Sequence, residues 1–120
     1  MIGFYDSSHP DEYKENNYPK LLVYKTRPVG VVRVDLDTAS RIAGFRRVAI
    51  LADEQRKGFG RDLMKQSEEF ALCHGCSHLH ANVSPAAIGF YEKIGYELDP
   101  DHPLNDPKNP RMKKEIQTNQ

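Results

Sequence analysis

A strand, a glycine-containing turn and the start of a helix follow one another in residues 48–61, which read Val-Ala-Ile-Leu-Ala-Asp-Glu-Gln-Arg-Lys-Gly-Phe-Gly-Arg. The apolar strand pattern ends after the Ile-Leu step, and the helical pattern follows Gly60. Glycines in such a turn let successive backbone N–H groups face inward, and the helix N-terminus adds partial positive charge. Three cations, Arg56, Lys57 and Arg61, surround the turn. It is therefore a candidate site for a diphosphate.

The turn differs from the two best-known phosphate-binding fingerprints. It lacks the Gly-x-Gly-x-x-Gly pattern of dinucleotide-binding domains, and no Gly-Lys-Ser/Thr step follows as in a Walker loop. Taken alone, a Gly-x-Gly pair in a basic turn is as often a solvated surface loop as a binding site. The neighbouring segments determine which interpretation holds.

The segments on either side of the turn predict a single α/β sheet domain over residues 1–120, because strand and helix patterns alternate without a repeat or an internal linker. In chain order, the predicted elements are strands at 21–24, 29–36 and 42–51, a helix at 63–74, a strand at 77–83, a helix at 85–94, and strands at 96–98 and 111–116. The first two strands form an antiparallel hairpin, and the last is expected at a sheet edge after a proline-rich loop.

The composition argues against several classes of partner. The 17 basic residues balance 17 acidic ones, and a net charge of 0 argues against nucleic acid or a membrane surface as a partner. The charge is unevenly distributed, however: residues 41–61 hold six cations and two anions, an excess of +4 around the glycine turn. Apolar runs are far shorter than the roughly 20 residues of a membrane helix, and no secretory signal is recognisable, so we expect a cytoplasmic protein.

A Cys-x-x-Cys-x-His-x-His run offers four potential zinc ligands: Cys73, Cys76, His78 and His80. A helix end at Gly75 and a strand directly after it would turn the histidines away from the helix-end thiols. A thioredoxin-type redox pair needs a strand before the motif and a helix after it, the reverse of this order. We therefore expect no metal, and a Cys/His metal module stays as an alternative that stoichiometric zinc would reveal.

Two motifs resemble the GNAT superfamily of N-acetyltransferases, and the resemblance covers roughly residues 21–116. The first is Gln-x-x-Gly-x-Gly at residues 55–60, after an apolar strand. The second is Ala-x-x-Phe-Tyr-Glu-Lys-x-Gly-Tyr at residues 87–96. The resemblance implies the acyl-CoA N-acyltransferase fold, a mixed, mainly antiparallel sheet flanked by helices.

The function that the resemblance implies is transfer of an acetyl group from acetyl-CoA to a primary amine of a small molecule, peptide or protein. The amine attacks the thioester directly in a ternary complex, without a covalent intermediate or a metal. In the family, the loop amides hold the pyrophosphate and the end of the preceding strand pairs with the pantetheine arm. The residues assigned to acetyl-CoA in this way are Val48, Ala49, Ile50, Gln55, Arg56, Lys57, Gly58, Phe59, Gly60, Arg61, Asn82 and Ser84. Ser84 stands where many relatives have an asparagine, and an N-cap role of its side chain also explains it.

The resemblance also implies a general acid, Tyr91, which lies near the acetyl-CoA sulfur in the family and protonates the departing thiolate. Tyr91 as a core aromatic is the competing interpretation. The general base does not carry over, because Gly44 stands where relatives often have a glutamate. The remaining candidates are His80, which titrates near neutrality, Glu54, Asp35 and a bound water. A structural role is the competing interpretation for His80.

About twenty residues precede Leu21, where relatives usually have a strand and two helices that wall the acceptor site. The chain is therefore expected to lack most of these elements. Either the acceptor site is open, or a homodimer partner completes it, or the sequence is a fragment of a longer chain. The competing function is a non-catalytic acyl-CoA-binding sensor or interaction module on the same fold.

Overall fold

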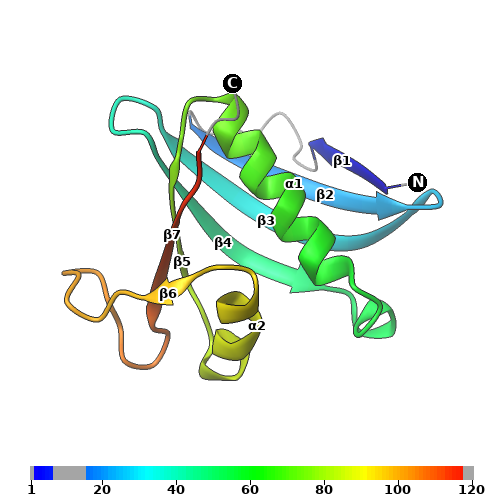
Figure 1. The fold of residues 1–120 in the computed structure, drawn as a ribbon. Coiled ribbons are helices and arrows are strands. Elements are labelled where there is room, and N and C mark those ends of the chain that lie inside the picture. The colour runs from blue at the N-terminus through cyan, green and yellow to red at the C-terminus, as the bar shows by residue number, and fades with distance from the viewer. Residues whose placement is uncertain (1, 7–15, 118–120) are drawn as a thin grey trace.

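The computed structural model describes residues 2–6 and 16–117, and in this part of the chain seven strands form one sheet in the order β1-β2-β3-β4-β5-β7-β6 (Figure 1). The strands are β1 (Ile2–Asp6), β2 (Asn17–Tyr24), β3 (Arg27–Asp37), β4 (Ile42–Ile50), β5 (His78–Asn82), β6 (Glu97–Leu98) and β7 (Arg111–Glu115). The helices are α1 (Phe59–Cys73) and α2 (Ile88–Lys93), each preceded by a short 3₁₀ turn, Ala52–Glu54 and Pro85–Ala87. Only β4 and β5 pair in parallel within the described residues. The predicted mixed, mainly antiparallel sheet flanked by helices is confirmed.

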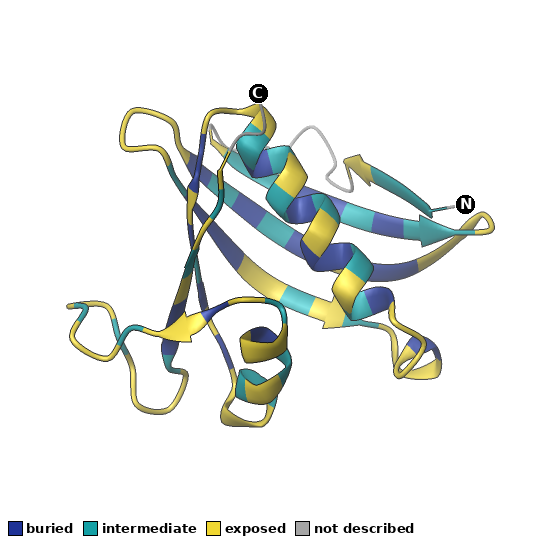
Figure 2. Ribbon diagram, in the orientation of Figure 1, coloured by how far each residue is buried: buried dark blue, intermediate teal, exposed yellow. Residues whose placement is uncertain are grey.

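The helix α1 packs across one face of the sheet, and the core lies between them (Figures 1 and 2). Its apolar stripe repeats at helical spacing, as the sequence predicted, and buries Phe59, Leu63, Met64 and Ala71. Opposite them lie alternate residues of the strands, which period-2 geometry points toward the helix: Leu22, Val32, Val34, Ala43, Phe45, Leu79 and Ala81. The helix begins at Phe59, four residues before the predicted start, because Gly58 ends the turn.

Two strands at the ends of the chain differ from the sequence prediction. Residues 111–116 were expected at a sheet edge, and this prediction is wrong, because β7 lies between β5 and β6 and pairs with both. Its charged sequence resembles an edge strand, yet Arg111 and Met112 are buried. The sequence assigned no element to residues 2–6, which form β1 and pair antiparallel with β2.

The parallel strands β4 and β5 separate halfway along β4. Their pairing runs from Ile42 opposite His78 to Phe45 opposite Ala81, whereas β4 continues to pair with β3 as far as Ile50. The two ribbons diverge from this point in Figure 1. Within the described residues, the backbone of residues 46–50 therefore has no strand partner on its β5 side.

A bulge in β4 lies directly after the point of separation. Between the pairs Val31–Ala49 and Arg33–Arg46, β4 has one residue more than β3, and Arg47 there adopts a positive φ of 53°. Bulges bend a strand and interrupt its ladder. The bulge and the separation together leave the β5-facing backbone of residues 46–50 without a strand partner in the described part of the chain, and we call this divergence of the two strands the wedge.

Candidate active site

A cavity of about 440 Å³ lies where β4 ends and α1 begins. Its lining residues are Ile50, Glu54, Gln55, Arg56, Gly58, Gly60, Arg61 and Phe90. Arg56 and Gly58 adopt positive φ values of 66° and 87°, which curl the turn so that neighbouring amides can face one anion. No side chain of the described residues caps α1, whose N-cap is Gly58. The first N–H groups of the helix are thus left for a ligand, and an anion is the partner they favour.

A buried carboxylate anchors this turn. The side chain of Glu54 is 8% exposed, and its two oxygens lie 3.0 Å from Nη1 of Arg27 and 3.2 Å from Nζ of Lys57. The Gln55 amide donates to the carbonyl of Ile50, 3.2 Å away, which fixes the turn to the end of β4. Because both oxygens of Glu54 form ion pairs here, we assign Glu54 to the anchoring of the turn and not to the role of general base.

Most of the predicted cofactor residues lie on β4 or in the turn that follows it. Val48 and Ala49 lie on the part of β4 that has separated from β5, whereas Arg56 and Arg61 extend from the turn into solvent. Within the described residues, neither arginine has an ion-pair partner, so both charges are available to phosphate. The Phe59 ring points into the core against Tyr24, with ring centroids 5.2 Å apart. Phe59 can therefore offer a ligand its backbone, but not its side chain.

Asn82 and Ser84 lie at the far side of the wedge, where β5 ends. The Asn82 amide donates to the carbonyls of Leu104 (3.4 Å) and Asn109 (3.1 Å), and so anchors the 99–110 loop. Ser84 occupies the N-cap of the turn at Pro85, but its hydroxyl makes no capping hydrogen bond. The expectation of a side-chain cap at Ser84 is wrong, because the N–H of Ala87 donates to the backbone carbonyl of Ser84 (2.9 Å) and not to its hydroxyl.

The helix α2 contributes Phe90 to the lining of the cofactor cavity, and Tyr91, which follows it in the chain, is not itself a lining residue. Phe90 lies over Gly60, where an added Cβ would be 3.3 Å from its ring, so glycine permits the close approach of α2 to α1. The Tyr91 side chain is buried between the edge-on rings of Phe90 and Tyr96, at centroid distances of 5.3 and 5.4 Å. This burial raises the pKa of Tyr91 to about 12. The phenol therefore keeps its proton at neutral pH.

The hydroxyl groups of the two neighbouring tyrosines differ in their partners. Tyr96 donates a hydrogen bond of 2.8 Å to Glu68 on α1. Within the described residues, the hydroxyl of Tyr91 makes no hydrogen bond. This hydroxyl is not among the buried polar atoms that lack a partner, so it has accessible surface and its proton is available to a ligand.

The imidazole of His80 fills the space beside Gly44. The two residues are register partners on β5 and β4, and a Cβ on Gly44 would lie 2.5 Å from Cε1 of His80. The imidazole of His80, from the neighbouring strand, thus occupies the space that a glutamate side chain at position 44 would fill. Burial, followed by the positive charges of Arg111 and His102, lowers the pKa of His80 to about 4. At neutral pH the ring is neutral and has a free lone pair.

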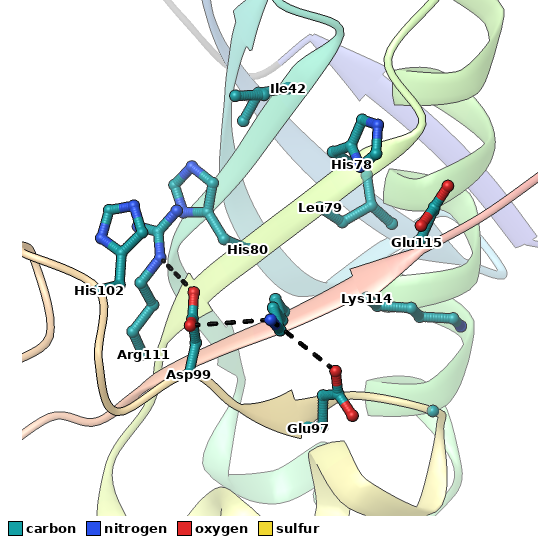
Figure 3. A pocket seen from close by; sticks show the side chains of 12 residues that line it. Ile42, His78, Leu79, His80, Glu97, Asp99, His102, Arg111, Lys114 and Glu115 are labelled. Atoms are coloured by element: carbon teal, nitrogen blue, oxygen red, sulfur yellow. Dashed lines mark ion pairs between the residues drawn. The ribbon is translucent and has the colours of Figure 1, made fainter.

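His80 belongs to a second cavity, of about 460 Å³, which extends over β5, β6 and β7 (Figure 3). Its lining includes His102, Arg111 and Asp99, which no sequence pattern connected to the site. These residues come from the 99–110 loop and from β7, so only the strand pairing brings them to His80. Asp35 faces Gly44 from β3, but its carboxylate is bound by Arg46.

The four potential zinc ligands of the Cys/His alternative form no metal-binding group within the described residues. Cys73 is exposed at the end of α1, whereas Cys76 is buried. Among residues 2–6 and 16–117, no group of three or more His, Cys, Asp or Glu side chains lies where it could hold a metal ion. In the same residues, no helix has the length and apolar character needed to span a membrane.

Comparisons with known proteins agree with this geometry. A family model described as the acetyltransferase (GNAT) family matches residues 2–96. The chain is 26% identical over 96 residues to YyaT of Bacillus subtilis (strain 168), covering 80% of this chain and 64% of YyaT. The chain thus spans less than two thirds of the length of this curated relative.

Two solved structures share the fold along nearly their whole length. The ribosomal-protein-S18-alanine N-acetyltransferase from Escherichia coli has a TM-score of 0.77 and 17% identity, and the match covers 100% of this chain and 97% of that one. A GNAT family acetyltransferase from Elizabethkingia anophelis with acetyl-CoA bound has a TM-score of 0.75 and 14% identity, covering 96% of this chain and 98% of that one.

Proposed function

The chain belongs to the GNAT family of acetyltransferases, and we propose that it transfers the acetyl group of acetyl-CoA to a primary amine. One observation carries the proposal: within the described residues, the β5-facing edge of residues 46–50 has no strand partner, and the turn that follows it ends at an uncapped helix N-terminus at Gly58. An unpaired strand edge suits an extended, amide-containing arm, and an uncapped helix start suits a diphosphate. Acetyl-CoA contains both groups in this order.

In the proposed complex, the diphosphate lies on the amides of residues 56–61, with Arg56 and Arg61 offsetting its charge. The pantetheine arm pairs with the β4 backbone at Val48, Ala49 and Ile50, and passes Asn82 and Ser84 at the end of β5. The side chains of Gln55 and Glu54 hold the turn in its conformation without contacting the phosphates. Lys57 can reach the diphosphate only by sharing its contact with Glu54.

The proposed reaction uses two side chains on opposite sides of the wedge. The neutral amine attacks the thioester carbonyl, a C–N bond forms, and the C–S bond breaks. The imidazole of His80, neutral because its pKa is about 4, accepts the amine proton and releases it to the water of the open cavity. The phenol of Tyr91 donates its proton to the departing thiolate and recovers one from solvent.

The variant Gly44→Ala tests the role of His80. The added methyl group would lie 2.5 Å from Cε1 of the ring, so His80 must move. We expect kcat to fall about tenfold, while the KM for acetyl-CoA stays within about twofold, because the cofactor cavity lies on other residues. Steady-state kinetics with each substrate varied measures both values.

The control for this substitution is Gly89→Ala on α2, where an added Cβ meets nothing within 4 Å. Its kinetics should equal those of the parent protein, and its thermal stability should rise slightly, since glycine weakens a helix interior. If folded Gly44→Ala retained full kcat, His80 would have no part in the reaction.

A sensor that binds acetyl-CoA without turnover is the second candidate. It is favoured by the missing carboxylate at Gly44 and by the low pKa of His80, which makes the imidazole a weak base. The cofactor cavity would be the same in both cases. The two functions therefore differ only in whether bound acetyl-CoA reacts.

Thiol release from acetyl-CoA separates the two candidates. The purified chain is mixed with acetyl-CoA and a panel of small amines, amino acids and peptides, and free CoA is measured with a thiol reagent, alongside calorimetric titration of acetyl-CoA. We expect saturable binding and acceptor-dependent thiol release. Saturable binding without release on any acceptor would favour the sensor, and the absence of binding would contradict both functions.

A further inference from the structure

We propose that the acceptor amine carries a carboxylate, and that Arg111 binds this carboxylate in the cavity over β5, β6 and β7. The inference rests on the proposed acetyl transfer and identifies the chemical class of its acceptor. It comes from the unsatisfied hydrogen-bonding capacity of Arg111, its place beside His80, and the charges around it.

Arg111 is a buried cation with an unused donor. Its side chain is 9% exposed, and its Nε is buried without a hydrogen-bond partner among the described residues. The nearest carboxylate oxygen, Oδ2 of Asp99, is 3.5 Å away, longer than the 2.7–3.2 Å of an N–H···O hydrogen bond. A buried donor left unsatisfied is costly, and fully buried arginines are rare unless they are paired. Nη1 and Nη2 are not among the buried atoms without a partner and make no hydrogen bond within the described residues, and Arg111 lines the cavity. A ligand oxygen can therefore reach these two nitrogens.

The surroundings of Arg111 favour an anion. Figure 3 shows its guanidinium together with His80 and His102 at one end of the cavity. Of the charged neighbours that act on His80, Arg111 has the largest effect and outweighs the opposing carboxylate of Asp35. Arginine also has the planar pair of donors that matches a carboxylate.

The acidic residues of the cavity do not cancel this charge. Asp99 lies between two cations, 3.5 Å from Nε of Arg111 and 3.8 Å from Nζ of Lys113, so one carboxylate faces two positive charges. Glu97, 4.0 Å from Lys113, has a side chain that is 75% exposed, and water screens its charge. Glu115, which also lines the cavity, is the register partner of His78 and lies four residues along β7 from Arg111. At the Arg111 end, two cations therefore face one buried carboxylate.

The position of Arg111 relates the carboxylate to the reacting amine. On β7, Arg111 is the register partner of Asn82, and Lys113 is the partner of His80. Arg111 is thus two residues, about 7 Å, nearer than Lys113 to the opening of the wedge. A carboxylate held there lies close to the amine that meets the thioester. An α-amino acid, whose amine and carboxylate share one carbon, fits this spacing.

The backbone of Arg111 holds the adjoining loop through two hydrogen bonds that do not depend on its side chain. The backbone N–H of Arg111 donates to Oδ1 of Asn105 (2.9 Å), and its carbonyl accepts from the N–H of Asp99 (2.9 Å). A side-chain substitution leaves both bonds in place. The variant Arg111→Gln therefore removes the cation while it preserves the attachment of the loop.

The test compares each amino acid with its own carboxamide as acceptor, by the ratio of their kcat/KM values. We expect the best acceptor to be used at least about tenfold better as the carboxylate, since a charge-assisted hydrogen bond contributes about 10- to 100-fold. Arg111→Gln should bring this ratio close to one. Asp99→Asn should raise the ratio, because it removes a competing carboxylate. Lys108→Gln, an exposed loop residue outside the cavity lining, is the control and should leave the ratio unchanged.

Each outcome distinguishes this inference from the proposed function. Equal use of acid and amide by the parent protein, or an equal loss on both in Arg111→Gln, would overturn the inference but leave acetyl transfer intact. If Arg111→Gln does not fold, an unchanged ratio in Asp99→Asn overturns it.

If acetyl-CoA binds without any turnover, the test is calorimetric titration of the CoA complex with an N-acetyl amino acid and with its amide. Tenfold tighter binding of the acid supports the carboxylate site, and equal binding overturns it. Without acetyl-CoA binding, both proposals fail.

Discussion

Replacement of Gly58 by aspartate is expected to weaken acetyl-CoA binding at least about 100-fold. The residue is the N-cap of α1, and its amide neighbours are proposed to hold the diphosphate. A carboxylate placed there faces the phosphates directly. Two like charges about 4 Å apart repel by about 4 kcal/mol at the effective dielectric of a protein surface, and 1.4 kcal/mol corresponds to a factor of ten. Calorimetric titration of acetyl-CoA measures the effect.

The matched control is Gly58→Asn, which has the same shape as the aspartate variant but no charge. Asparagine tolerates the left-handed conformation at φ 87°, and a Cβ at this position meets nothing within 4 Å, so both variants should fold with a similar cost of about 1 kcal/mol. We expect Gly58→Asn to lose less than about tenfold in affinity. Equal affinities of the folded aspartate and asparagine variants for acetyl-CoA would show that the diphosphate does not bind at this turn.

Replacement of Tyr91 by phenylalanine is expected to lower kcat about 100-fold, the lower end of what a positioned acid contributes. The ring and its packing against Phe90 and Tyr96 remain, so the KM for acetyl-CoA should stay within about twofold. Steady-state kinetics at saturating acceptor measures both values. Full turnover in the phenylalanine variant would exclude Tyr91 from the mechanism.

The pH dependence of the parent protein tests the same residue. Burial raises the pKa of Tyr91 to about 12, above the ordinary value near 10, so the group stays protonated as the pH rises through 10. We therefore expect no loss of kcat between pH 8 and 10 from this residue. A loss in that interval that disappears in Tyr91→Phe would contradict the raised pKa.

Tyr96→Phe is the control for these measurements. It removes the hydrogen bond to Glu68 and should reduce the free energy of unfolding by about 1–2 kcal/mol. Its kcat should stay close to that of the parent protein, because the Tyr96 hydroxyl donates to Glu68 and is not available to a ligand. The two substitutions thus distinguish a hydroxyl group that stabilises the fold, on Tyr96, from one that is proposed to react, on Tyr91.

The parts of the site that were predicted from the sequence depend on local structure. The turn at residues 55–60 needs a strand before it, a helix after it and a residue such as Gly58 that accepts a positive φ, and all three are visible in one stretch. The helix with Tyr91 is likewise marked by Pro85 at its start and Gly95 after its end. Local patterns of this kind fix the approach of α2 to α1 through Gly60 and Phe90.

The parts that the sequence did not reveal depend on pairing between distant segments. The strand β7 inserts between β5 and β6, and its charged residues alone indicate only an edge. Arg111 and His102 reach His80 through this insertion, across about twenty to thirty residues of chain. The contact of His80 with Gly44 depends on the parallel register of β4 and β5, which no short-range pattern specifies.

The central proposal is that the wedge between β4 and β5 holds the arm of acetyl-CoA, and the structure of the complex with acetyl-CoA tests it most directly. We predict diphosphate oxygens within about 3 Å of the amide nitrogens of residues 56–61. We also predict hydrogen bonds from the pantetheine arm to the β4 backbone between Arg46 and Ile50. Acetyl-CoA bound elsewhere, with the β4 backbone uncontacted, would contradict the proposal.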